Sequence, residues 1–227
     1  MINKKVGTIA LGLSLMLSAS TQVLAFGLGG LGGSALSSVT GGGTNSNTNW
    51  GNLASTGQNA EKDIYGGTRL MALSTLSMAD ALGYKSEAAS LNSQVKKMSE
   101  DGSVSGDFDL GETTKMADSV MDKIIKDKAQ LTKIDEKQKK KLGKAMEEYS
   151  IGGFKYITGA KAISDVASKA GNAPMSEMMK FAGMIKLVPT TIKGAQHLFG
   201  KIGQVVEVMR AADVAVPDDM DNLTSDF

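Results

Sequence analysis

Two long stretches of the sequence repeat apolar or small residues at alternating steps of four and three, between residues 142 and 170 and between 178 and 209. In an α-helix this spacing places the repeated residues in a single stripe. Three members of the first stripe, Gly153, Ala160 and Ala167, are small enough to let a neighbouring helix approach closely. The pattern therefore predicts two long helices packed against each other.

The ends of these helices are also marked in the sequence. Gly171 and Asn172, followed by Pro174, end the first pattern. Pro189 lies inside the second pattern without changing its phase, which predicts one long helix that is kinked at the proline.

Three shorter helical patterns come earlier in the chain. The first covers residues 68–82 and ends at Gly83, and the second covers 84–98, with Ser86 as its expected cap. The third is centred on 116–124, and a short break is expected before Asp135. No strand pattern competes with them, and aromatic residues make up only 5% of the chain. The expected fold is all-α, an antiparallel helical bundle of four to six helices.

The N-terminal part of the chain has a different composition. Residues 26–60 carry no charge and are rich in glycine, serine and asparagine, which predicts a flexible leader. We expect the helical bundle to occupy residues 61–213 and an acidic tail to occupy 214–227. The chain contains no cysteine, so the fold must be held by packing alone.

Residues 1–25 resemble a cleaved signal peptide. Lys4 and Lys5 precede an apolar run that is too short for a good membrane-spanning helix, and Val23-Leu24-Ala25 places small residues where a signal peptidase cleaves. We expect an exported protein whose mature chain starts at Phe26, with the periplasm preferred and an extracellular location as the alternative.

Composition and motifs exclude several classes of function. The chain carries 25 Lys and Arg against 24 Asp and Glu, so it is not a general polyanion binder, and export makes nucleic acid an unsuitable partner. It lacks the common zinc-protease, serine-hydrolase and phosphate-loop motifs. The one histidine, His197, is interpreted as structural. We therefore expect a protein that is not an enzyme.

The segment 101–112 resembles an EF-hand calcium loop. Gly106 falls at the position of the sharp turn, and helical patterns lie on both sides. Serine replaces aspartate twice and no second loop is present, which predicts weak calcium affinity. The alternative is an acidic connector rich in turn-forming residues. The candidate calcium ligands are Asp101, Ser103, Ser105, Asp107, Asp109 and Glu112.

Four methionines, Met175, Met178, Met179 and Met184, lie near the start of the last long helix. Thioethers can bind Cu(I), but methionine is also a flexible filler of hydrophobic cores, and core packing is the preferred interpretation.

The last helix is cationic as well as apolar. Between Met178 and Val206 it contains no acidic residue, a composition typical of helices that lie on membrane surfaces. The alternative is a bundle helix whose lysines only face water. The candidate membrane-contacting residues are Lys180, Lys186, Lys193 and Lys201.

These features predict an exported, non-enzymatic helical protein of the cell envelope that binds a protein partner or an anionic membrane surface. A helical module that binds calcium or a small ligand, for example an apolar ligand between kinked helices, is the first alternative. The second is a secreted helical toxin that acts on membranes.

Overall fold

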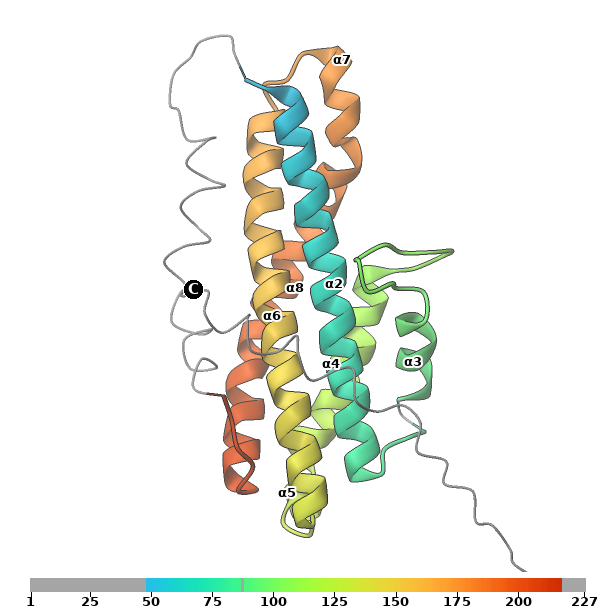
Figure 1. Ribbon diagram of the computed structural model, residues 1–227, viewed down its shortest axis with the longest axis vertical. Coiled ribbons are helices and arrows are strands. Elements are labelled where there is room, and N and C mark those ends of the chain that lie inside the picture. Colours follow the sequence, from blue (N-terminus) through green and yellow to red (C-terminus); the bar gives the residue numbers. More distant parts are fainter. Residues whose placement is uncertain (1–47, 87, 218–227) are drawn as a thin grey trace, which may run out of the picture. The chain divides into compact units, whose positions relative to one another are not determined.

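The computed structural model describes residues 48–86 and 88–217 (Figure 1). The expectations for residues 1–25, for the cleavage site, for most of the leader and for the end of the acidic tail lie outside these residues. The described part of the chain is helical, apart from turns and one isolated bridge between Met98 and Val104. The all-α prediction is therefore confirmed. The elements are α2 (Trp50–Leu82), α3 (Ala89–Val95), α4 (Leu110–Lys126), α5 (Lys128–Leu131), α6 (Glu136–Ala170), α7 (Met175–Met178), the 3₁₀ helix η1 (Met179–Phe181) and α8 (Ala182–Ala211).

Helix α2 begins at Trp50, so the predicted leader is wrong over residues 50–60. The Asn49 side chain caps the helix by accepting a hydrogen bond of 3.1 Å from the backbone N–H of Asn52. Leu53 and Ala60 are buried. The first turns of α2 therefore belong to the core, although their composition resembles that of a tether. The helix ends as predicted at Gly83, whose φ of 87° is a left-handed conformation that favours glycine.

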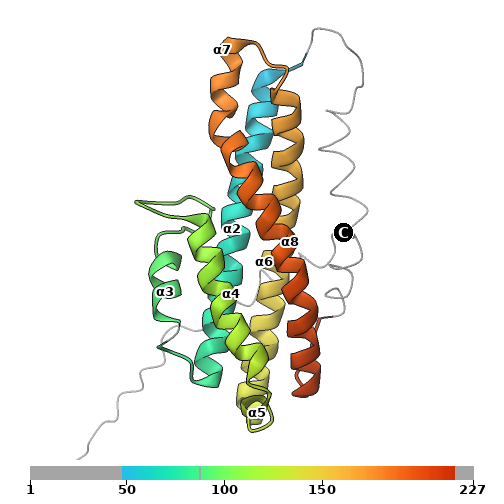
Figure 2. The same ribbon diagram turned by 180° about the vertical axis from the view of Figure 1, so that it is seen from behind.

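The two longest helices, α2 and α6, lie side by side and run in opposite directions (Figures 1 and 2). Their backbones approach closely at three glycines. A Cβ atom on Gly67 would lie 2.6 Å from the carbonyl oxygen of Gly152, and one on Gly159 would lie 2.7 Å from the carbonyl oxygen of Ala60. Close approach was predicted, but at Gly153, Ala160 and Ala167. The contact instead uses residues one position earlier, and its partner is α2.

Helix α8 packs on α6 and α4. Pro189 lies inside it, so the prediction of a single helix through the proline is confirmed. The regular helix begins at Ala182, after α7 and η1, and its second half buries Ile202, Val206 and Met209. The predicted packing of the 142–170 helix on the 178–209 helix is present, but it is less extensive than the contact between α6 and α2.

The region between α2 and α6 is built from shorter pieces than the sequence suggests. Helix α3 covers only seven residues, and Ala88, not Ser86, stands at its N-cap. Leu91 and Val95 of α3 still pack, together with Met98 after the helix, in a core cluster that also contains Ala72 of α2. The predicted break before Asp135 is confirmed, because Asp135 and Gln138 form a capping box at the start of α6.

None of the helices in residues 48–86 and 88–217 combines the length and the apolar character needed to cross a bilayer.

Candidate functional site

Exposed apolar side chains gather on α7, η1 and the first half of α8. Seven large hydrophobic residues are exposed in the described part of the chain, and five of them lie here. Met178, Ile185 and Ile192 are spaced by seven residues and therefore share one face of the helical path. Met175 and Met179, next to them, are 87% and 83% exposed. We call these five residues, Met175, Met178, Met179, Ile185 and Ile192, the Met–Ile surface.

Two lysines border this surface on one side. Lys186 and Lys193 directly follow Ile185 and Ile192, and both are exposed. A step of one residue turns the helix by about 100°, and a step of seven returns it nearly to the same face. The two lysines therefore form a parallel row beside the apolar stripe. Ala182 and Pro189, also exposed, continue the stripe between the larger side chains.

The other two predicted membrane-contacting lysines are placed differently. Lys201 is buried, with its side chain 11% exposed, and its ammonium group pairs with Asp122 of α4. It therefore offers no charge to an external surface, and its assignment as a contact residue is corrected. Lys180 is exposed but lies 2.7 Å from Glu177, which locally balances its charge. Of the predicted set, Lys186 and Lys193 remain as exposed lysines on the first half of α8.

The interpretation of the methionines as core fillers holds for one of the four. Met184 is 4% exposed, and its sulfur occupies the space where a side chain at position 57 of α2 would lie. Met175 and Met179 project into solvent and Met178 is 40% exposed. The four thioethers thus lie in different environments, one in the core and three at the surface.

Charged residues join α8 to α4 below the Met–Ile surface, where the two helices lie beside each other (Figure 2). His197 Nε2 lies 2.7 Å from Asp118 Oδ2, one helical turn from the pair formed by Lys201 and Asp122. We call Asp118, Asp122, His197 and Lys201 the α4–α8 charge cluster. In the sequence, Asp118 and Asp122 are four residues apart, as are His197 and Lys201, but this spacing could not show that the two helices meet.

The two carboxylates of this cluster have opposite pKa shifts. Burial raises the pKa of Asp118, although the charges of His197 and Lys201 oppose this. The hydrogen bond from Lys201 lowers the pKa of Asp122. On α6, burial and, less strongly, the charge of Asp118 raise the pKa of Tyr149. His197 contacts Asp118 between the two helices, and its structural role stays a prediction.

The predicted calcium loop is a tight hairpin in which several candidate ligands have protein partners. The Asp101 carboxylate accepts hydrogen bonds from the backbone N–H and the hydroxyl of Ser103. Asp107 lies 2.8 Å from the ammonium of Lys97. Asp109 caps α4 by accepting a hydrogen bond from the backbone N–H of Glu112. The carbonyl oxygen of Asp107, the atom that an EF-hand loop would use at this position, also lies 3.5 Å from the Lys97 ammonium.

The remaining candidate ligands of this loop are spread in the same way. Ser105 donates a hydrogen bond to the Lys97 carbonyl oxygen, and Gln94 donates one to the Glu112 carboxylate. In residues 48–86 and 88–217 no three His, Cys, Asp or Glu side chains stand close enough together to hold a metal ion. Calcium binding by residues 101–112 stays a prediction.

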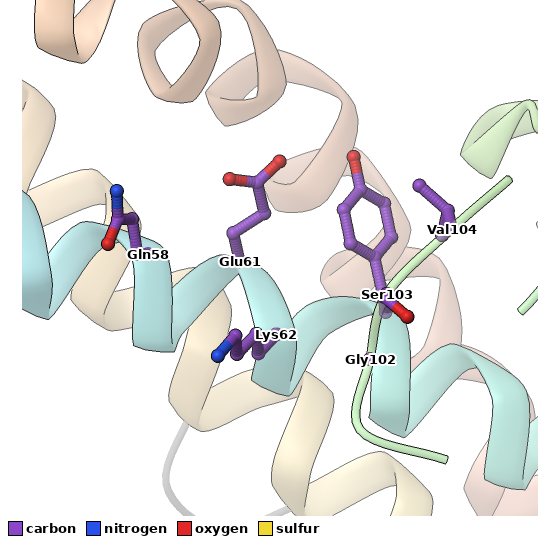
Figure 3. Close-up of a pocket in the computed structure, with 7 residues that line it drawn as sticks. Gln58, Glu61, Lys62, Gly102, Ser103 and Val104 are labelled. Atoms are coloured by element: carbon purple, nitrogen blue, oxygen red, sulfur yellow. The ribbon is translucent and has the colours of Figure 1, made fainter. Parts of the chain in front are cut away.

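A shallow pocket of about 250 Å³ lies where this hairpin meets α2. Figure 3 shows Gln58, Glu61 and Lys62 on α2 beside the segment that carries Gly102, Ser103 and Val104. Tyr65 completes the lining. Burial, and next the charge of Glu61, raises the pKa of Tyr65 to about 12. The lining thus combines charged side chains, a phenol and the apolar side chain of Val104.

Comparisons of the chain with protein-family models, with curated proteins and with solved structures find no match.

Proposed function

We propose that this protein is an exported, non-enzymatic antiparallel helical bundle that binds an anionic membrane surface through the Met–Ile surface and the lysines beside it. The observation that carries the proposal is the gathering of exposed apolar side chains on α7, η1 and the first half of α8. Isolated exposed apolar residues are common on proteins, but a contiguous group of them is typical of an interaction site.

The arrangement of the surface fits a helix that lies in the interface of a bilayer. Such helices place apolar side chains at the boundary between headgroups and acyl chains, while lysines along the edge reach the lipid phosphates. Ile185 and Ile192 supply the apolar face, and Lys186 and Lys193 supply the charged edge. The exposed Met175 and Met179 extend the apolar area at the end of the molecule where α2 begins and α6 ends (Figures 1 and 2).

The lysines and the apolar side chains are expected to contribute different amounts to the free energy of membrane binding. A lysine near an anionic membrane contributes about 1 kcal/mol, so two lysines give about 2 kcal/mol. Fully burying a methionine or isoleucine side chain contributes roughly 1.5–3 kcal/mol. Insertion of the apolar side chains must therefore supply most of the binding free energy, while the lysines set the preference for anionic lipid.

The proposal is tested by co-sedimentation of the mature protein with vesicles. One set contains phosphatidylglycerol and phosphatidylcholine, and the other contains phosphatidylcholine alone. We expect binding to the anionic vesicles that weakens with added salt, because exposed charges are screened over about 10 Å at 0.1 M salt. Lys186→Gln with Lys193→Gln should remove most of the preference for anionic vesicles.

Matched variants control for charge and for hydrophobicity elsewhere on the protein. Lys137→Gln with Lys140→Gln removes the same charge from exposed positions on α6 and should leave binding unchanged. Ile185→Ser should weaken binding, whereas Ile151→Ser, at a residue of α6 that is similarly exposed, should not.

Four outcomes would point away from the proposal. Equal binding to both vesicle types, or equal loss in the α6 lysine variant, would contradict the assigned surface. If the protein binds no vesicles, the result would favour a protein partner as the ligand of the Met–Ile surface. Release of a dye trapped in the vesicles would favour the membrane-active toxin.

A further inference from the structure

The methionines of the described chain fall into two environments. Met175 and Met179 are 87% and 83% exposed, and Met178 is 40% exposed. All three lie in or directly after α7, within the Met–Ile surface. Met116 is partly buried. The buried methionines are Met71, Met78, Met98, Met121, Met146, Met184 and Met209.

This difference in exposure determines which thioethers a dissolved oxidant can reach. A peroxide oxidises a thioether by transferring one oxygen atom to sulfur. The O–O bond breaks, the sulfur loses two electrons, and the rest of the peroxide leaves as water or an alcohol. The chain contains no cysteine, so no thiol of the protein competes for the oxidant.

The product has the opposite polarity from the side chain it replaces. A sulfoxide carries a strongly polar S=O group, and it converts a flexible apolar side chain into a polar one. On the solvent-exposed methionines this change should cost the folded protein little. In a bilayer interface it places an S=O group where the proposed contact requires apolar surface, which is unfavourable.

We propose that Met175, Met178 and Met179 form an oxidation site that switches off membrane binding by the Met–Ile surface. This inference rests on the proposed function. Reversal requires a methionine sulfoxide reductase, in which two thiols form a disulfide and the sulfoxide oxygen leaves as water. The site lies on the protein surface, so an enzyme can reach it.

The test combines peptide mass mapping with vesicle binding. The mature protein is treated with dilute hydrogen peroxide, which is then removed with catalase. We expect each of Met175 and Met179 to gain one oxygen atom before any buried methionine does. Binding to phosphatidylglycerol-containing vesicles should be lost in parallel, with unchanged far-UV circular dichroism.

Two sets of substitutions make the result specific to these sulfurs. Replacing all three residues by leucine removes the thioethers, so peroxide treatment should not change the vesicle binding of this variant relative to its own untreated sample. Met175→Gln with Met179→Gln imitates the polar product and should bind weakly without peroxide. Treatment of the oxidised wild type with a sulfoxide reductase and dithiothreitol should restore binding.

Each failure has its own meaning. Unchanged binding after complete oxidation of the three methionines would overturn the switch alone. Loss of binding in the peroxide-treated leucine variant would assign the effect to another residue and also overturn it. An untreated wild type that does not bind these vesicles would overturn both the proposed function and the switch.

Discussion

Two aspartates one helical turn apart on α4 show how position sets the chemistry of a residue. Asp118 is 18% exposed, and burial is the main cause of its raised pKa. Asp122 is 45% exposed and accepts a hydrogen bond from Lys201, which lowers its pKa. Burial therefore favours the protonated form of the first, while pairing favours the ionised form of the second. The two residues should make opposite contributions to the pH dependence of stability.

We expect Asp118→Asn and Asp122→Asn to reveal these opposite contributions. Because the pKa of Asp118 is raised in the folded state, its contribution to stability is complete below its unfolded pKa of about 3.9. That contribution is lost as pH rises through the folded value. Because the pKa of Asp122 is lowered, its contribution is present above about 3.9 and is lost as pH falls through the folded value.

Urea unfolding at pH 3, 5 and 7 measures both effects. Relative to Asp118→Asn, the wild type should lose stability between pH 3 and 7, and relative to Asp122→Asn it should gain stability. At pH 7, Asp122→Asn should cost about 1–3 kcal/mol, because the buried ammonium of Lys201 loses its ionised acceptor. Differences of the same sign for both variants would contradict the assignment.

At the scale of helices, glycine decides how closely α2 and α6 pack. Gly67, Gly152 and Gly159 lower the intrinsic propensity of their helices, but they allow backbone contact that a Cβ atom would prevent. Gly203 of α8 is different, since no atom outside its own helical turn lies within 4 Å of an added Cβ. The same residue type is therefore required at one site and unfavourable at the other.

Gly67→Ala should destabilise the protein by about 1–3 kcal/mol, because its Cβ would meet backbone atoms that cannot move independently. Gly203→Ala, the matched control, should stabilise it by up to about 1 kcal/mol through helix propensity. Thermal unfolding followed by circular dichroism compares the two. A stabilised Gly67→Ala variant would mean that α2 and α6 are further apart than described.

Calcium binding is predicted for residues 101–112, most of which connect α3 to α4. Isothermal titration of the mature protein should show weak binding that disappears in Glu112→Gln, because the bidentate carboxylate closes an EF-hand loop. Capping of α4 by Asp109 does not use the Glu112 side chain, so this variant should keep its helix content. Binding that survives the substitution, or none at millimolar calcium, would remove the prediction.

At the scale of the whole molecule, the helical part must be stable without covalent crosslinks. The chain has no cysteine, and its largest buried side chains come from α2, α3, α4, α6, η1 and α8. Helices that are far apart in the sequence thus contribute to the same buried interior. Burial of apolar side chains therefore holds the helical part together without disulfides.

The proposed export predicts a defined N-terminus for the mature protein. Protein recovered from the cell envelope or the medium should begin at Phe26, because small residues precede it at the positions that a signal peptidase recognises. N-terminal sequencing measures this directly. Recovery of an intact Met1 terminus on cytoplasmic protein would contradict both the cleavage site and the proposed location.

Local sequence determined where several helices end and which of them are continuous. The end of α6 before Pro174, the start of α6 at Asp135 and the passage of α8 through Pro189 all follow from caps and periodicity. These signals are local, since each depends on residues within a few turns of one another. The sequence likewise predicted that Lys186 and Lys193 belong to a cationic helix.

Tertiary structure alone decided which helices meet and which faces they cover. Apolar spacing predicts a stripe on a helix but does not show which helix packs against it. Helix α6 packs mainly on α2, through Gly152 and Gly159, and less extensively on α8. For the same reason Lys201 is buried against Asp122, while Met175 and Met179 remain in solvent. Burial depends on contacts between residues far apart in the chain, and these also make Trp50 the start of a helix in a segment whose composition resembles a linker.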